Sequence, residues 1–262
     1  MRRSAVLVSV ISLAALAGLA RPLAAADVPP ATVLVTGASR GIGLELARQY
    51  ADRGWRVIAT ARRPADSGEL VALSAGRPNV VLEPLDVTDF AQIDALAAKY
   101  KGEPIDVLIN NAGISGPVPS QFLGRMDYAV FRSVLETNAV GPMRLSEALL
   151  PSVLASRQRK IVTISSSEAS FGRIDAARLY WYRASKAAVN MLMLNLALDL
   201  KKKGGTVAVI NPGPVDTDFM KGVKMPLQKP AAAVGKVIGI IDRVTLDETG
   251  KFWDYDGGQL PW

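Results

Sequence analysis

Tyr182 and Lys186 are the residues of this sequence with the clearest capacity for chemistry. They stand four residues apart in "LYWYRASKAAVN" (179–190), so on a helix they share one face, whereas Tyr180 points elsewhere. A free tyrosine has a pKa of about 10, too high for efficient acid–base catalysis at neutral pH, and a nearby ammonium lowers it by favouring the phenolate. The pair therefore predicts a proton-donating tyrosine tuned by Lys186. The alternative is an ordinary polar helix surface, because this spacing is common.

Two absences narrow the possible chemistry. The 262 residues include no cysteine and no histidine. This excludes disulfides, thiolate nucleophiles, zinc sites built from thiolates or imidazoles, and Ser-His-Asp triads. Acid–base chemistry near neutral pH must then come from Tyr, Lys, Asp or Glu, and we expect no metal.

A glycine-rich segment, "VTGASRGIG" (35–43), predicts a dinucleotide site. Gly37, Gly41 and Gly43 fall where a side chain would block a tight turn, the approach of a pyrophosphate, or close helix–strand packing. The helix that follows offers free N–H groups to phosphates. A glycine triplet alone is weak evidence, but its strand–turn–helix context supports the interpretation. The predicted cofactor contacts here are Gly37, Ser39, Arg40, Gly41, Ile42 and Gly43.

The end of the second predicted strand indicates which dinucleotide is bound. In "IATARRP", Ala61 takes the place of the acid that would bind a ribose 2′-hydroxyl, and Arg62 and Arg63 follow it. Arg40 in the glycine loop is close enough in such a fold to reach the same group. Guanidinium groups suit a 2′-phosphate, so the sequence predicts NADP(H) rather than NAD(H). The alternative is that these arginines only face solvent.

The elements that must position these residues alternate between strand and helix. This pattern predicts an α/β fold: a single doubly wound Rossmann-type domain over residues 27–262, with a seven-stranded, mostly parallel sheet. Thr88 or Asp89 is expected to cap the helix 90–100, and Gly141-Pro142 to interrupt two helices within 127–156. The predicted strands are 31–36, 55–61, 79–87, 105–113, 160–167, 206–215 and 250–257, and the other helices are 42–54, 90–100 and 179–203.

Residues 1–26 carry the pattern of a signal peptide. Two arginines open the chain, a charge-free stretch runs from Ser4 to Ala20, and Ala24-Ala25-Ala26 fits a cleavage site. A permanent membrane anchor is the second alternative, and a buried helix the third. We expect export to the periplasm if the signal is used, with no stable membrane span after processing. Otherwise the protein is cytoplasmic or anchored through its N-terminus.

The basic residues do not predict a nucleic-acid partner. The net charge is +7, and 28 basic and 24 acidic residues remain once residues 1–26 are set aside. The one short run, "KKKGG" (201–205), is typical of a solvated helix end, where cations also suit the helix dipole.

Taken together, the motifs resemble the short-chain dehydrogenase/reductase family over residues 31–262. The resemblance rests on the order and spacing of "TGASRGIG", "LDVTD", "NNAG", "TNAVGP", "ISSS", "YRASK" and "NPGPVDTD". The segments "YRASKAAVNM" and "FWDYDGGQLPW" are most similar to the branch of C-factor and sniffer-type carbonyl reductases.

The resemblance implies further site residues. It marks Asn138 as the active-site asparagine, although a hydrogen bond at a helix interruption is an alternative role. It selects Ser166 from three serines, and strand alternation turns Ser165 and Ser167 to the opposite face. The further implied cofactor contacts are Asp86, Val87, Asn111, Ala112, Gly113, Pro212, Gly213, Val215 and Thr217, together with Tyr182 and Lys186.

The expected function is reversible, NADPH-dependent reduction of a ketone or aldehyde, with Tyr182 as the proton donor and a small carbonyl or alcohol molecule as substrate. The rival interpretation is a non-catalytic dinucleotide-binding signalling protein on the same fold. The complete set of Asn138, Ser166, Tyr182 and Lys186 favours the enzyme. The resemblance also implies a homodimer or homotetramer formed through the long helices.

Overall fold

One seven-stranded sheet organises the computed structural model, which describes residues 29–262. The strand order is β3-β2-β1-β4-β5-β6-β7, and every pairing within the sheet is parallel. This confirms the predicted doubly wound α/β class. The strands are β1 (Thr32–Val35), β2 (Arg56–Ala61), β3 (Val80–Pro84), β4 (Val107–Asn110), β5 (Lys160–Ile164), β6 (Thr206–Ile210) and β7 (Phe252–Trp253). The predicted signal peptide lies outside the described residues.

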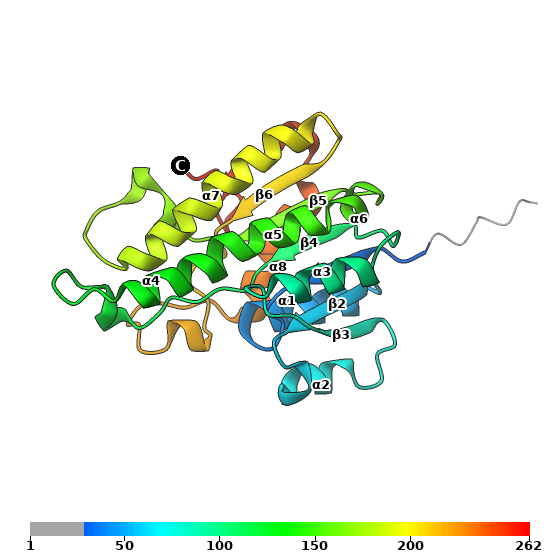
Figure 1. Ribbon diagram of the computed structural model, residues 1–262, viewed down its shortest axis with the longest axis horizontal. Coiled ribbons are helices and arrows are strands. Elements are labelled where there is room, and N and C mark those ends of the chain that lie inside the picture. The colour runs from blue at the N-terminus through cyan, green and yellow to red at the C-terminus, as the bar shows by residue number, and fades with distance from the viewer. Residues whose placement is uncertain (1–28) are drawn as a thin grey trace, which may run out of the picture.

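Helices cover both faces of the sheet (Figure 1). One layer holds α1 (Gly41–Asp52), α2 (Gly68–Ser74) and α8 (Pro230–Arg243). The other holds α3 (Phe90–Lys99), α4 (Tyr128–Leu135), α5 (Gly141–Ala148), α6 (Leu150–Leu154) and α7 (Tyr180–Lys201). No helix within residues 29–262 combines the length and the apolar character needed to cross a membrane.

The core lies in two layers, one on each side of the sheet, because alternate residues of a strand face opposite ways. In β1, Val33 and Val35 pack towards α1 and α8, whereas Leu34 packs towards the α3–α5–α7 side. All four residues of β1 are buried. Burial on both faces explains why the strands are almost continuously apolar rather than alternating.

The predicted interruption between two helices lies just before Gly141-Pro142 and is a π turn rather than a break. The chain stays helical from Tyr128 to Ala148, and a π-helical turn, Glu136–Val140, joins α4 to α5. Gly141 and Pro142 form the first turn of α5. A proline lacks the N–H that an α-helix bonds four residues back, and the wider π turn accommodates this. Gly141 is required by packing, since a Cβ there would lie 2.4 Å from the Val87 carbonyl oxygen.

Other helices differ in smaller ways from the prediction. Of the two candidate caps for α3, Asp89 is the one that caps it, accepting a hydrogen bond from the Gln92 N–H at 3.1 Å. Helices α2 and α8 are not among the predicted elements. Gly235 and Gly239 weaken the helical pattern of α8, and α2 is only seven residues long.

The segments that follow the carboxyl ends of the strands gather at one end of the molecule, at the left in Figure 1. Residues 36–40 follow β1, residues 111–127 follow β4, residues 165–179 follow β5 and residues 211–229 follow β6. In open parallel sheets, ligands bind at this edge. The predicted site residues fall almost entirely within these segments or next to them.

Candidate active site

Four predicted residues meet at this edge, although they come from three elements. Asn138 lies on the π turn, Ser166 just beyond β5, and Tyr182 and Lys186 on α7. Asn138, Tyr182 and Lys186 are buried, with 1%, 8% and 6% of their surface exposed. A Cβ at Gly113 would lie 3.2 Å from Asn138 Oδ1 and 3.5 Å from Lys186 Nζ, so the end of β4 approaches both side chains closely.

Lys186 is fixed against the end of β5. Its Nζ donates a hydrogen bond to the Ile164 carbonyl oxygen at 2.8 Å and lies 5.9 Å from the centre of the Tyr182 ring. Burial disfavours the ammonium and lowers the pKa of Lys186 to about 8. At neutral pH most of the Lys186 side chains therefore still carry a positive charge.

The pKa of Tyr182 differs from the prediction. Burial raises it to about 12, although a hydrogen bond with Ser166 acts in the opposite direction, and the nearby Glu168 carboxylate raises it further. The predicted lowering by Lys186 is not seen: desolvation of the phenolate is the largest effect, and the Lys186 ammonium is hydrogen-bonded to the Ile164 carbonyl. Tyr182 is a protonated phenol at neutral pH, which is the form that donates a proton.

Asn138 joins two parts of the site. Its Oδ1 accepts from the Ile114 N–H at 2.8 Å, and its Nδ2 donates to the Ile114 carbonyl and to Ser185 Oγ, at 2.8 and 2.9 Å. Ser185 Oγ in turn donates to the Tyr182 carbonyl at 2.8 Å. The Asn138 amide thus links the segment after β4 to α7. Its role goes beyond a local hydrogen bond at a helix interruption, which was the alternative.

The neighbouring serines have different partners. Ser166 Oγ accepts from the Glu168 N–H at 3.2 Å and caps the short 3₁₀ turn Ser167–Ala169. Ser165 Oγ donates to Asn190 Oδ1 at 2.6 Å, deep in the core. Of this run, Ser166 is the serine whose hydroxyl lowers the pKa of Tyr182.

The glycine loop has the conformation that its residues require. Gly37 and Gly41 have φ angles of +66° and +59°, which side chains rarely adopt. A Cβ at Gly43 would lie 2.2 Å from the Gly37 carbonyl oxygen. Asn111 braces the loop, since its Nδ2 donates to the Thr36 carbonyl at 2.8 Å. Helix α1 begins here with no side-chain cap from Arg40, which leaves N–H groups for an anion.

The predicted arginines near this loop are not equivalent. Arg62 follows β2, is exposed, and makes no ion pair with any residue in 29–262. Arg40 pairs with Asp218 and Arg63 with Asp66, both at 3.2 Å and both on the surface. The Ser67 hydroxyl donates to the Ser39 carbonyl at 2.8 Å, which holds the segment after β2 close to the glycine loop.

The other predicted cofactor residues continue along the same edge. The Asp86 carboxylate accepts from the N–H and hydroxyl of Thr88, at 2.9 and 2.7 Å, and Val87 is buried beneath Gly141. A Cβ at Gly41 would lie 3.3 Å from the Thr217 methyl, so the segment after β6 reaches the glycine loop. In that segment Gly213 has a φ of +74° and Val215 is buried.

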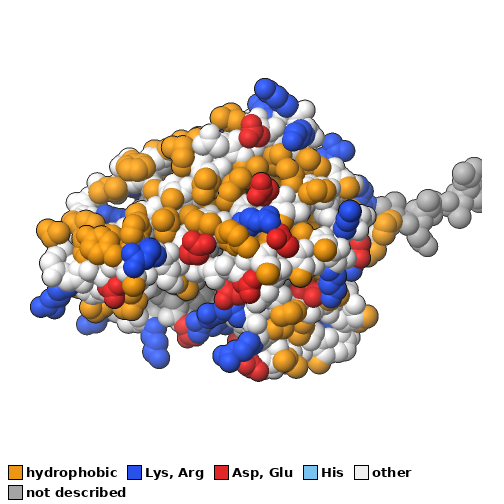
Figure 2. Space-filling view, in the orientation of Figure 1, with side chains coloured by type: hydrophobic (Ala, Val, Ile, Leu, Met, Phe, Trp, Pro, Cys, Tyr) orange, Lys and Arg blue, Asp and Glu red, His pale blue; other side chains and the backbone are white. Residues whose placement is uncertain are grey.

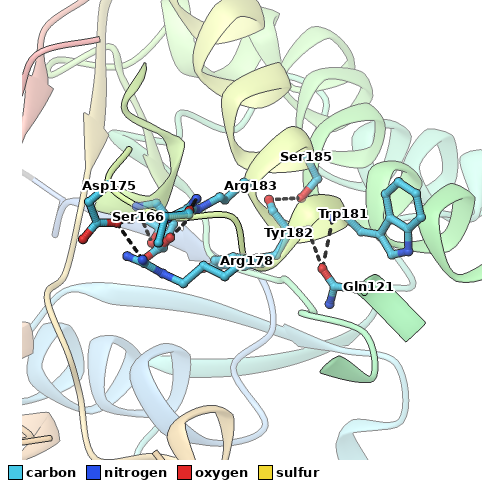
Figure 3. Close-up of polar contacts among 10 residues, drawn as sticks. Gln121, Ser166, Asp175, Arg178, Trp181, Tyr182, Arg183 and Ser185 are labelled. Atoms are coloured by element: carbon cyan, nitrogen blue, oxygen red, sulfur yellow. Dashed lines mark hydrogen bonds and ion pairs between the residues drawn. The ribbon is translucent and has the colours of Figure 1, made fainter. Parts of the chain in front are cut away.

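The close-up in Figure 3 shows residues that the sequence did not indicate. The buried Gln121 side chain accepts hydrogen bonds from the N–H groups of Trp181 and Tyr182. Two arginines, Arg183 and Arg178, form ion pairs with Glu168 at 2.5 and 3.0 Å. No short-range pattern marks Gln121, because its partners lie about sixty residues away in the sequence.

Comparison with known proteins agrees with this geometry. Residues 31–227 match the family model described as short chain dehydrogenase. The chain is 37% identical over 237 residues to the 1-hydroxy-2-glutathionyl-2-methyl-3-butene dehydrogenase of Rhodococcus sp. strain AD45, covering 88% of this chain and 99% of that relative.

Solved structures are also similar. The NADPH-bound carbonyl reductase from chicken fatty liver has a TM-score of 0.83 at 30% identity, covering 90% of this chain and all of that chain. The carbonyl reductase Sniffer of D. melanogaster has a TM-score of 0.81 at 27% identity, covering 89% of this chain and all of that chain. These findings confirm the resemblance that the motifs indicated.

Proposed function

Because the chain belongs to the short-chain dehydrogenase family of oxidoreductases, we propose that it is an NADPH-dependent reductase of ketones or aldehydes, acting reversibly. The observation that carries the proposal is that Lys186 Nζ lies 5.9 Å from the Tyr182 ring and Ser166 is next to the same phenol, at the sheet edge that also holds the glycine loop. The complete set of Asn138, Ser166, Tyr182 and Lys186 favours this function over the non-catalytic alternative.

The residues of the glycine loop fit a dinucleotide. The loop lacks side chains where they would clash, and it presents the start of α1 towards the phosphates. Arg62, with Arg40, provides a cation for a 2′-phosphate. The similar chicken reductase is described as NADPH-bound, which supports NADP(H) over NAD(H) here. When bound, NADPH supplies the hydride.

Tyr182 is proposed as the general acid. Its hydroxyl gives its proton to the carbonyl oxygen as the hydride reaches the carbonyl carbon, so that both atoms of the C=O bond gain one hydrogen. Ser166, which contacts the same hydroxyl, orients the carbonyl and stabilises the charge on its oxygen. The Lys186 ammonium, held by Ile164, stabilises the phenolate that remains on Tyr182.

We also propose that the substrates have an apolar body. Most of the large exposed apolar side chains of residues 29–262 come from the segments around the site. Figure 2 shows hydrophobic side chains gathered at the same left-hand end of the molecule. Phe219 lies 5.5 Å from Tyr182, measured between ring centres. The apolar residues are Ile114, Val118, Phe122, Leu123, Phe171, Ile174, Phe219, Val223 and Met225.

The test is NADPH oxidation with a panel of aromatic and aliphatic ketones and aldehydes, with Tyr182→Phe as the control. We expect turnover that is greatest for apolar carbonyl compounds and is lost in the variant, with NADPH binding retained. Full activity in Tyr182→Phe, or preference for NADH, would contradict the proposal.

Two further proposals concern the whole protein. We propose that residues 1–26 are removed as a signal peptide, which N-terminal sequencing of the protein from fractionated cells tests. We propose that the long helices form a homodimer or homotetramer interface, consistent with the exposed Met191 and Leu198 on α7. Light scattering of the purified protein measures that oligomeric state.

A further inference from the structure

Gln121 makes an unusual set of contacts with the helix that carries Tyr182. It ends the 3₁₀ turn Val118–Gln121 and is 1% exposed. Its Oε1 accepts from the Trp181 N–H at 3.0 Å and from the Tyr182 N–H at 3.2 Å, as Figure 3 shows. Its Nε2 donates to the Ser115 carbonyl at 2.8 Å. One amide therefore joins the backbone of Tyr182 to the segment that follows β4.

The first N–H groups of α7 need a hydrogen-bond acceptor from another segment, because the N-cap residue of α7 does not supply one. The first N–H groups of a helix have no partner within it, and a Ser, Thr, Asp or Asn side chain usually caps them. Here the N-cap residue is Leu179, which has no hydrogen-bonding side chain and a left-handed backbone, with φ of +50° and ψ of +45°. Gln121 supplies this cap from a distant segment.

Of the catalytic residues, Tyr182 depends most on this cap for its position. Lys186 is already one turn inside the helix and is held by the Ile164 carbonyl, and Ser166 follows β5. Tyr182 lies in the first turn of α7, the part of a helix that frays most readily. A second bond, from Trp181 Nε1 to the Ser120 carbonyl at 3.0 Å, links the same two segments but does not involve Tyr182.

We infer that Gln121 is a positioning residue: its amide holds the first turn of α7 so that the Tyr182 hydroxyl faces Ser166. The kinetic part of this inference rests on the proposed reductase function. Gln121 acts through Tyr182, and its side-chain hydrogen bonds are all with backbone groups.

The deciding variant is Gln121→Met, which removes both hydrogen-bonding functions at similar volume. We expect kcat to fall about 10- to 100-fold, because small misplacements of a catalytic group have effects of this size. The Kd of NADPH is expected to change less than about twofold, since the glycine loop is not involved. Gln121→Glu keeps an acceptor for both N–H groups and is expected to recover part of the lost kcat.

Trp181→Phe is the matched control. It removes the parallel bond to Ser120 and so lowers the melting temperature, but it leaves the Gln121 contacts in place. We expect kcat within about twofold of the wild type. Should Gln121→Met fail to fold, Gln121→Asn, whose shorter side chain cannot span both segments, is expected to give the same loss of kcat.

A measurement without turnover separates this inference from the proposed function. In protein labelled with fluorotyrosine, Tyr182→Phe identifies the ¹⁹F signal of Tyr182. We expect that signal to shift or broaden in Gln121→Met and Gln121→Asn but to keep its width in Trp181→Phe. An unchanged signal, or wild-type kcat in the folded Gln121 variants, overturns the inference. A wild type without turnover overturns the reductase proposal alone, because the fluorine signal still tests Gln121.

Discussion

The glycine loop and the Tyr182 region are built in different ways. The glycine loop is a short continuous stretch whose shape follows from missing side chains, such as the Cβ that Gly43 cannot accept. The Tyr182 region is assembled from segments far apart in the sequence by buried side chains, among them Gln121 and Asn138. Changes in the loop should therefore act on cofactor affinity, and changes around Tyr182 on turnover.

The largest expected effect is in the Tyr182 region. Tyr182→Phe should lower kcat by about 10²- to 10⁴-fold, the usual contribution of a general acid, and should leave the Kd of NADPH nearly unchanged. Steady-state kinetics and fluorescence titration with NADPH measure the two effects. Equal losses of affinity and turnover would remove the distinction between the regions.

Gly43→Ala should mainly lower the affinity for NADPH, whereas Tyr182→Phe mainly lowers kcat. The new Cβ would lie 2.2 Å from the Gly37 carbonyl oxygen and 2.5 Å from Asn111 Nδ2, so the loop must move. We expect NADPH affinity to fall at least about tenfold and stability to fall by about 1–3 kcal/mol. Gly68→Ala is the control, since a Cβ there meets no atom within 4 Å. Unchanged NADPH binding in Gly43→Ala would contradict this account of the loop.

Arg62→Ala tests which part of the cofactor site distinguishes NADPH from NADH. A charge-assisted bond to a 2′-phosphate contributes about 1.5–3 kcal/mol, so the preference for NADPH over NADH should fall about 10- to 100-fold. The ratio of kcat/KM for the two cofactors measures it. Arg48→Ala, which removes an ion pair between the exposed Arg48 and Glu45 on α1, should leave that ratio as it is.

Lys186 should also make the stability of the protein depend on pH. Its pKa is about 8 in the folded protein, against an ordinary lysine value of 10.5, so the unfolded chain binds more protons between these pH values. The free energy of unfolding should therefore rise with pH from about 8 to 10. Tyr182, with a raised pKa of about 12, begins to oppose this only above about pH 10. Urea unfolding at several pH values should show a steeper rise in the wild type than in Lys186→Met.

The difference between a continuous loop and a region assembled from distant segments also explains which features could be predicted from the sequence. The sheet, the glycine loop and the Tyr182–Lys186 pair follow from local patterns, and the structure has them where the sequence places them. Gln121 did not stand out because its partners are distant, and Gly141-Pro142 was misinterpreted because the preceding π turn has no clear sequence signal. The pKa of Tyr182 was predicted in the wrong direction because the extent of burial depends on the whole fold.

The π turn between α4 and α5 has a consequence for insertions and deletions. It adds one residue to a helical turn without ending the helix. Removing one residue of Glu136–Val140 would leave an ordinary α-helical turn, so Gly141 could still face Val87. Inside α5, the same deletion would rotate the residues on its two sides against each other by about 100°. A one-residue deletion is therefore expected to be tolerated better in the π turn than within α5, and its main cost would fall on the contacts that Asn138 makes with Ile114.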